Sequence, residues 1–224
     1  MSALRALLLC NGDRLEQPEF HRRYLQYPED DTFELIGGIV YQAPPVSIAH
    51  SNYDVEFGFA LGLYHHATPG THTLHNATTI LSKESEVQPD LGLRILPEYG
   101  GQSSNKDKFV HGGIELVVEV AVSSRSIDLH AKRDAYKKAG VIEYCVVSVE
   151  SRELFWFHFP DDIRMSPDRK GVVRSNVFPG LWIHTEALLG LDSVKLREVA
   201  EQGIASRPHA VFVRKLERQR KASS

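Results

Sequence analysis

Residues 114–122 constrain the fold more than any other part of this 224-residue chain. They read Ile-Glu-Leu-Val-Val-Glu-Val-Ala-Val, so apolar side chains occupy both faces of an extended segment. A strand of this kind is covered on both sides, which is typical of the centre of a sheet in an α/β protein. Helical spacing follows over residues 128–139, and a second apolar strand over 141–149. Because a helix connects them, we expect the two strands to be parallel.

The rest of the chain predicts antiparallel additions to this crossover. A hairpin is expected over residues 33–41, where apolar runs flank Gly37 and Gly38. A helix is predicted over 48–66, where Val55, Phe59 and Leu63 recur at helical spacing with Ala60 beside them. The other expected elements are helices over 16–26, 186–189 and 195–201, strands over 71–81, 86–96, 153–159 and 171–177, and a polar loop over 98–113.

These patterns predict an α/β fold, a mixed β-sheet flanked by helices with antiparallel hairpin additions. We expect one domain over residues 1–190 and a helical, basic C-terminal extension over 191–224. No apolar run approaches the ~20 residues that cross a bilayer, and the N-terminal ten residues do not resemble a signal peptide. Cys10 and Cys145 are the only cysteines, which favours a reducing, cytoplasmic location over a disulfide scaffold.

Charge is distributed unevenly along the chain. Residues 1–206 hold 20 Lys and Arg against 28 Asp and Glu, a net charge of −8, whereas residues 207–224 hold six basic residues against one acid, a net charge of +5. An acidic body with a basic tail can approach a nucleic acid through local patches. The alternative is a solvated tail that only keeps the protein in solution.

Three ionisable residues interrupt apolar patterns. Glu119 lies in the middle of the central strand, where an unpaired carboxylate would cost several kcal/mol, so a cation or a pKa shift is expected there. Asp90 follows Pro89 inside a strand-like run, and Lys132 shares a helical stripe with Tyr136 that is expected to face the sheet. The plainer alternatives are a solvent-facing Glu119 and a Lys132 that reaches the surface or pairs with Asp128.

The sequence resembles the Uma-type family of restriction endonucleases within the PD-(D/E)XK nuclease superfamily. The resemblance runs from about residue 16 to residue 189 and depends on the order and spacing of short motifs. The matching stretches are 33–38 (Phe-Glu-Leu-Ile-Gly-Gly), Ala49 with His50, 88–91 (Gln-Pro-Asp-Leu), 116–120 (Leu-Val-Val-Glu-Val), Asp128 with Leu129, Lys132 with Tyr136, and 140–144 (Gly-Val-Ile-Glu-Tyr).

The resemblance implies a metal-dependent endonuclease acting on DNA. Asp90 and Glu119 correspond to its metal-binding carboxylates, Glu34 to an additional acid, and Lys132 to the catalytic lysine, moved from the strand, where Ala121 stands, to the helix. The expected cofactor is Mg²⁺, with Mn²⁺ as a substitute, because hard carboxylate oxygens suit these ions. No organic cofactor and no membrane partner are expected, and a homodimer is expected by analogy with endonucleases that cut both strands.

Two other functions stay open from the sequence. Ile39 stands where the family has an acid, which favours a catalytically silent version of the fold that binds nucleic acid or protein. A zinc-dependent or histidine-dependent hydrolase is the third reading, because His65, His66, His72 and His75 lie close together in sequence. No pair of these histidines has the i,i+4 spacing around a Glu that a zinc peptidase requires.

Overall fold

The computed structural model describes residues 8–28 and 31–223. Residues 1–7 lie outside the described residues, as do residues 29 and 30. The prediction that the N-terminal ten residues are not a signal peptide falls mostly on this part of the chain. Across the described residues, none of the helices combines the length and the apolar character that a membrane span requires.

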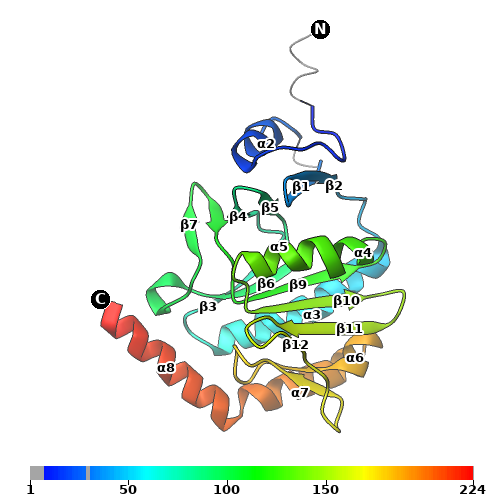
Figure 1. Cartoon of the computed structure of the whole chain (residues 1–224). Helices are drawn as coiled ribbons and strands as arrows, with labels where there is room; N and C mark the ends of the chain where they lie inside the picture. The colour runs from blue at the N-terminus through cyan, green and yellow to red at the C-terminus, as the bar shows by residue number, and fades with distance from the viewer. Residues whose placement is uncertain (1–7, 29–30, 224) are drawn as a thin grey trace.

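The main sheet has six strands in the order β12-β11-β10-β9-β6-β3 (Figure 1). β9 and β10 are parallel, with Val146 opposite Glu119, and a helical connection joins them, so the predicted crossover is confirmed. β9 also pairs with β6 in antiparallel fashion and is therefore an interior strand. The strand bounds are β3 Thr71–His75, β6 Leu91–Ile95, β9 Leu116–Ala121, β10 Glu143–Ser148, β11 Glu153–His158 and β12 Ile163–Arg164.

Helices and a second sheet cover the two faces of the main sheet (Figure 1). On one face, α3 (Ile48–Ala67) and the C-terminal helices build the larger core around Trp156 and Phe178. On the other face, α5 (Arg133–Lys138) packs through Tyr136 over Val117 and Tyr144. Glu119 is on this second face, beside the apolar cluster around Tyr136.

The second sheet has the order β2-β1-β5-β4-β8-β7. Its first pair is the predicted hairpin, with Gly37 and Gly38 at φ +59° and +80°, as a tight primed turn requires. α2 (Gln17–Tyr24) buries Phe20 beside it. The bounds are β1 Phe33–Ile36, β2 Ile39–Gln42, β4 Thr79–Ser82, β5 Ser85–Val87, β7 Ser104–Lys106 and β8 Phe109–His111, with a short 3₁₀ turn, η1, at Pro97–Tyr99.

Two of the predicted strands are wrong as continuous elements. The run over 71–81 is broken at Asn76, which has φ +49°, and the run over 86–96 is broken at Pro89, which has no N–H for a ladder. Each run therefore gives one strand to each sheet. The loop predicted over 98–113 contains the β7–β8 hairpin instead, with Asp107 and Lys108 in the left-handed region at its turn.

The helix predicted over 48–66 is present as α3, and the stripe of Val55 and Phe59 that indicated it is not the side that α3 buries. Val55 and Phe59 are 63% and 45% exposed. The core side of α3 carries Tyr53, Phe57, Ala60, Leu61 and Tyr64. The helix has apolar residues around most of its circumference, so the sequence pattern did not distinguish the two stripes.

The C-terminal residues pack against the domain core. After the two-stranded sheet of β13 (Val172–Arg174) and β14 (Trp182–His184) come α6 (Thr185–Leu189), α7 (Ser193–Ile204) and α8 (Arg207–Ser223). Leu196 of α7 and Phe212 and Leu216 of α8 belong to the larger core. The division of the chain at residue 190 stays a prediction.

Candidate active site

The sheet itself brings Asp90 and Glu119 together. β6 and β9 are antiparallel with Leu91 opposite Val118, so the next step of this register places Asp90 opposite Glu119. The backbone N–H of Val120 donates to Asp90 Oδ2 at 2.7 Å, which fixes the Asp90 carboxylate at the edge of β9. Opposite residues of an antiparallel pair are close neighbours, so two carboxylates meet at one point of the sheet.

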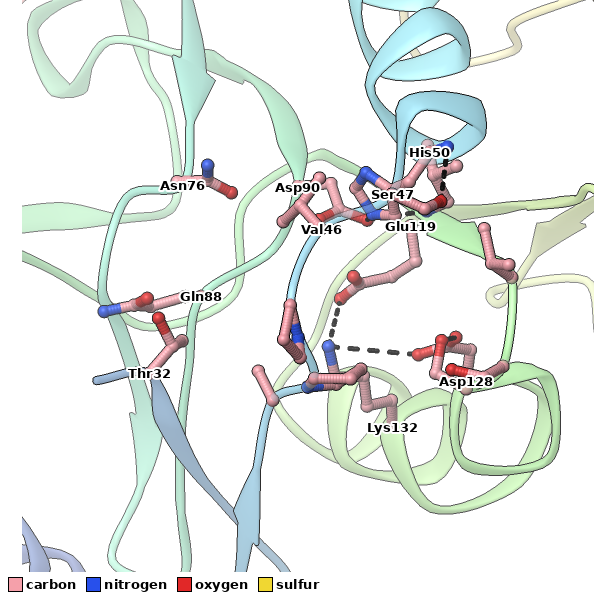
Figure 2. A pocket seen from close by; sticks show the side chains of 17 residues that line it. Thr32, Val46, Ser47, His50, Asn76, Gln88, Asp90, Glu119, Asp128 and Lys132 are labelled. Atoms are coloured by element: carbon pink, nitrogen blue, oxygen red, sulfur yellow. Dashed lines mark hydrogen bonds and ion pairs between the residues drawn. The ribbon is translucent and has the colours of Figure 1, made fainter. Parts of the chain in front are cut away.

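Lys132 is buried among carboxylates, and the plainer alternative of a surface lysine is wrong. Its Nζ lies 3.0 Å from Glu119 Oε1 and 2.9 Å from Glu34 Oε2, with 7% of the residue exposed. Asp128 Oδ1 is 3.9 Å away, so the i,i+4 pair that the sequence left open is the weakest of the three contacts. Figure 2 shows the ammonium between Glu119 and Asp128.

The local helix geometry aims Asp128 and Lys132 at the same place. Residues Asp128–Lys132 form a π-helical turn, η2, between the short α4 (Arg125–Ile127) and α5. Widened turns of this kind are rare and frequently occur at functional sites. Ser124 Oγ donates to Asp128 Oδ2 at 2.5 Å, and Tyr144 Oη donates to the Asp128 carbonyl at 2.9 Å. These bonds hold the widened turn against the sheet.

Glu119 also accepts a hydrogen bond from the Tyr136 hydroxyl, at 2.6 Å on the same Oε1 that faces Lys132. Burial raises the pKa of Glu119 well above its ordinary value, and the charges of Asp90 and Asp128 add to this against the opposing charge of Lys132. Burial alone would lower the pKa of Lys132, but Glu119 and Glu34 outweigh it and hold that pKa well above its ordinary value. Lys132 is therefore the fixed positive charge of the cluster.

Asp90 has a different partner from Glu119. His50, in the first turn of α3, places Nε2 3.2 Å from Asp90 Oδ2. Burial raises the pKa of Asp90, but the hydrogen bond from His50 and the charge of Lys132 more than offset it, so the net shift is downward. The pKa of His50 is raised by the same hydrogen bond. Asp90 is thus ionised at neutral pH.

These groups open onto one cavity of about 530 Å³. Figure 2 shows Asp90, Glu119, Asp128 and Lys132 on one side of it, with Thr32, Asn76 and Gln88 on the other. Both Asp90 and Glu119 line the cavity, so the two carboxylates lie on the same side of the sheet. The cavity combines carboxylate oxygens with one buried cation, a set of groups suited to holding a divalent metal ion beside an anionic substrate.

The donor set fits Mg²⁺ better than zinc. In residues 8–28 and 31–223, no three His, Cys, Asp or Glu side chains are grouped closely enough to form a ready metal site. Mg²⁺ is commonly held by only one or two carboxylates, with water and substrate phosphate completing its coordination. Asp90 Oδ1 and Glu119 Oε2 accept no hydrogen bond from the described part of the chain, so each carboxylate retains one oxygen for a cation.

Glu34 belongs to the cluster but does not line the cavity. Its Oε1 accepts from the backbone N–H of Gln88 at 2.8 Å, and its Oε2 pairs with Lys132. Both oxygens are therefore engaged within the protein. The ion pair with Lys132 suits a residue that positions the lysine. The role of Glu34 as a metal ligand stays a prediction.

The structure also assigns contacts that the sequence pattern does not reveal. Tyr136 shares the Lys132 stripe, and its i+4 spacing from Lys132 could have suggested that the two residues have a common partner. Asp128 is predicted from the sequence only as an alternative partner of Lys132. The contact between His50 and Asp90 joins residues 40 apart in sequence, and only the fold brings them together.

A comparison with protein families matches residues 18–186 to the Uma2 family, described as "Putative restriction endonuclease". No curated protein matches the sequence. A solved structure from Anabaena variabilis, described as a putative nuclease belonging to DUF820, is similar in fold, with a TM-score of 0.60 and 14% identity over 75% of this chain and 96% of that chain. The family match covers most of the chain and includes Glu34, Asp90, Glu119 and Lys132. The chain therefore belongs to the Uma2 family of restriction-endonuclease-like proteins.

Proposed function

We propose that this protein is a metal-dependent endonuclease that hydrolyses phosphodiester bonds in DNA, with Mg²⁺ as the cofactor and Mn²⁺ as a substitute. The observation that carries the proposal is the placement of Asp90 opposite Glu119 on one cavity, with the Lys132 ammonium 3.0 Å from Glu119. Membership of a family described as restriction endonucleases supports the nuclease class, as does the similar fold of a protein described as a nuclease.

In this proposal Asp90 and Glu119 hold the cation through Oδ1 and Oε2, the oxygens that accept no hydrogen bond from the described residues. A divalent cation bound there would polarise the phosphodiester and lower the pKa of a bound water. Ionised Asp90 is ready to bind, and a cation beside Glu119 would lower the pKa of that carboxyl, which burial raises.

Lys132 contributes a fixed positive charge beside the reacting phosphate. Its ammonium would stabilise the negative charge that develops on the phosphoryl oxygens and would orient the attacking water. Glu34 and Asp128 act as positioning residues, because their carboxylates lie 2.9 Å and 3.9 Å from the ammonium. Tyr136 orients Glu119 through its hydroxyl. We also propose a homodimer, the arrangement in which one site can act on each strand.

The test is incubation of the purified protein with supercoiled plasmid in Mg²⁺, in Mn²⁺ and in chelator, read as nicked and linear product on a gel. We expect cleavage only with a divalent cation, and none by the Asp90→Asn variant. Cleavage that survives in chelator would contradict the proposal. Absence of cleavage by the wild type under every divalent cation would favour the second function, a silent fold that binds DNA or protein.

A further inference from the structure

A second cavity lies next to the proposed active site, separated from it by residues 76–78. Asn76 lines the active-site cavity, whereas Ala77 and Thr78 line the second cavity, which has a volume of about 390 Å³. Gln88 connects the two, because it lines the first and donates through Nε2 to Thr78 Oγ1 at 3.1 Å. The second cavity is formed where the β7–β8 hairpin faces β3 and β6, and its lining includes Leu74, Arg94, Asn105, Lys108 and Phe109.

The two cavities have opposite charge. The active-site cavity is lined by three carboxylates, from Asp90, Glu119 and Asp128. No carboxylate lines the second cavity within the described residues, and its two charged groups are the guanidinium of Arg94 and the ammonium of Lys108. A pocket with two cations and no acid is complementary to an anion.

Arg94 is a buried cation with few partners. The residue is 5% exposed, its Nη1 donates to Asn105 Oδ1 at 2.7 Å, and its Nε is buried with no hydrogen-bond partner among the described residues. The nearby acid Glu115 accepts from the backbone N–H groups of Ile95 and Gln102 instead, and burial raises its pKa. Glu115 is therefore a weak counter-ion. A buried guanidinium without a close counter-ion is costly, and an anion in the cavity would offset that cost.

The other polar groups in the cavity are arranged as donors. Thr78 Oγ1 accepts from Gln88, which leaves its hydroxyl hydrogen to donate. The Asn105 oxygen accepts from Arg94, which leaves the amide N–H₂ to donate. Lys108 has φ +73° at the hairpin turn, an uncommon conformation for a lysine, and this turn places it at the cavity. A tetrahedral oxyanion can accept from several donors at once, as a phosphate does.

We propose that the pocket of Arg94, Lys108, Asn105 and Thr78 binds a phosphate group, either a phosphodiester of a nucleic-acid strand that continues from the active-site cavity or a free phosphate. The first source rests on the proposed function, and the second does not. The pocket would fix the register of a strand across residues 76–78 without taking part in the chemistry, because phosphate contacts position a nucleic acid.

Binding is tested on the intact protein without any measurement of cleavage. Inorganic phosphate is titrated at constant ionic strength against chloride, and the melting temperature is followed for the wild type and three variants. Arg94→Gln removes the buried cation and Lys108→Asn removes the rim cation with a residue that tolerates positive φ. Lys106→Asn is the matched control, since Lys106 is exposed on the same hairpin but does not line the pocket.

We expect phosphate to stabilise the wild type and Lys106→Asn equally, with affinity about tenfold weaker for Arg94→Gln and about threefold weaker for Lys108→Asn. Should Arg94→Gln fail to fold, the phosphate response of Lys108→Asn is compared with that of Lys106→Asn, and this comparison tests the proposal. Equal responses of these two lysine variants, or no effect of phosphate beyond chloride, would overturn the proposal.

A second arm distinguishes the two sources. DNA affinity is measured with a short duplex in chelator, so that no strand is cut. A loss of DNA affinity in Lys108→Asn but not in Lys106→Asn identifies a phosphodiester of the substrate strand, while unchanged DNA affinity with weakened phosphate binding identifies a free phosphate. If the protein never cleaves DNA, the phosphate titration still supports or overturns the pocket.

Discussion

At the scale of single residues, the proposed chemistry depends on how one buried lysine, Lys132, is shared by the carboxylates around it. The Lys132 ammonium contacts Glu34 and Glu119 at about hydrogen-bond distance, and all three residues are buried. Buried ion pairs add little net stability, but removal of one member leaves an uncompensated charge. The lysine is therefore required for the fold of the site as well as for the proposed chemistry, and the two roles need separate measurements.

Substitution of Lys132 by Met is expected to destabilise the protein by about 3 kcal/mol, because Glu34 and Glu119 lose their shared cation. Cleavage should fall by roughly 10²–10³. The double variant Glu34→Gln with Lys132→Met removes one excess negative charge and should recover much of the stability but none of the cleavage. Denaturant unfolding and plasmid cleavage on the same samples check this. Cleavage that returns together with stability would mean that Lys132 is only a structural partner.

The sequence predicted the residues whose chemistry conflicts with their surroundings. Glu119 was predictable because a carboxylate in a doubly covered strand requires a compensating partner, and Lys132 because a lysine on a core-facing stripe is out of pattern. Asp90 was marked only by its place after Pro89 inside a strand-like run, and Glu34 came from the family resemblance. The spacing of Tyr136 from Lys132 indicates at most a shared partner. Its hydrogen bond to Glu119, like that of His50 to Asp90, depends on side-chain direction in the folded chain.

At the scale of elements, one register and one widened turn build the site. The register of β6 on β9 sets Asp90 opposite Glu119, and η2 turns Asp128 and Lys132 toward them. The crossover from β9 to β10 was predictable from local pattern. The breaks at Asn76 and Pro89 were not, because strand propensity reports extended backbone and does not reveal which of two sheets a strand joins.

The attachment of α8 gives a prediction about pH. His209 of α8 lies with Nε2 2.8 Å from Thr68 Oγ1, and burial lowers its pKa from the ordinary 6.5. The folded state then binds fewer protons than the unfolded state, so this contribution to stability is present above the unfolded pKa and is lost as the pH falls. The melting temperature of His209→Gln should therefore decline less than that of the wild type between about pH 7.5 and about pH 5.5.

The pKa of His65 is also lowered by burial, so the melting temperature of His209→Gln should still fall somewhat as the pH falls. His65 therefore serves as an independent comparison. Differential scanning calorimetry over this pH range measures both. Identical slopes for the wild type and His209→Gln would show that the histidine does not link α8 to the rest of the fold.

At the scale of the whole molecule, the charge pattern suits a nucleic acid that contacts the protein through local cationic patches. The body carries −8 and the region from residue 207 carries +5, and Arg214, Lys215 and Arg218 lie on the exposed side of α8. Figure 1 places α8 along the outer edge of the molecule. A nucleic acid bound by a protein of this kind is expected to contact cationic patches, and its affinity should fall as salt rises.

Substitution of Arg214, Lys215 and Arg218 by Gln tests whether the cationic side of α8 contacts DNA. If all three contact phosphates, the slope of log affinity against log salt should become shallower by up to about 2.7, with cleavage chemistry unchanged at saturating DNA. Lys195→Gln with Arg197→Gln on α7 is the control, because these exposed cations already pair with Glu198 and Glu201. An equal change of slope in both variants would show that net charge alone, and not α8, governs DNA affinity.

The central claim is that Asp90 and Glu119 hold a divalent cation, and a thermal titration tests it most directly. Mg²⁺ or Mn²⁺ should raise the melting temperature of the wild type by mass action, because carboxylates that repel one another when empty are neutralised by the cation. Glu153→Gln, which removes a half-exposed carboxylate from β11 of the same sheet, should respond like the wild type. The account predicts that Glu119→Gln folds, is at least as stable without metal, and loses the response; a cation response retained in Glu119→Gln would contradict it.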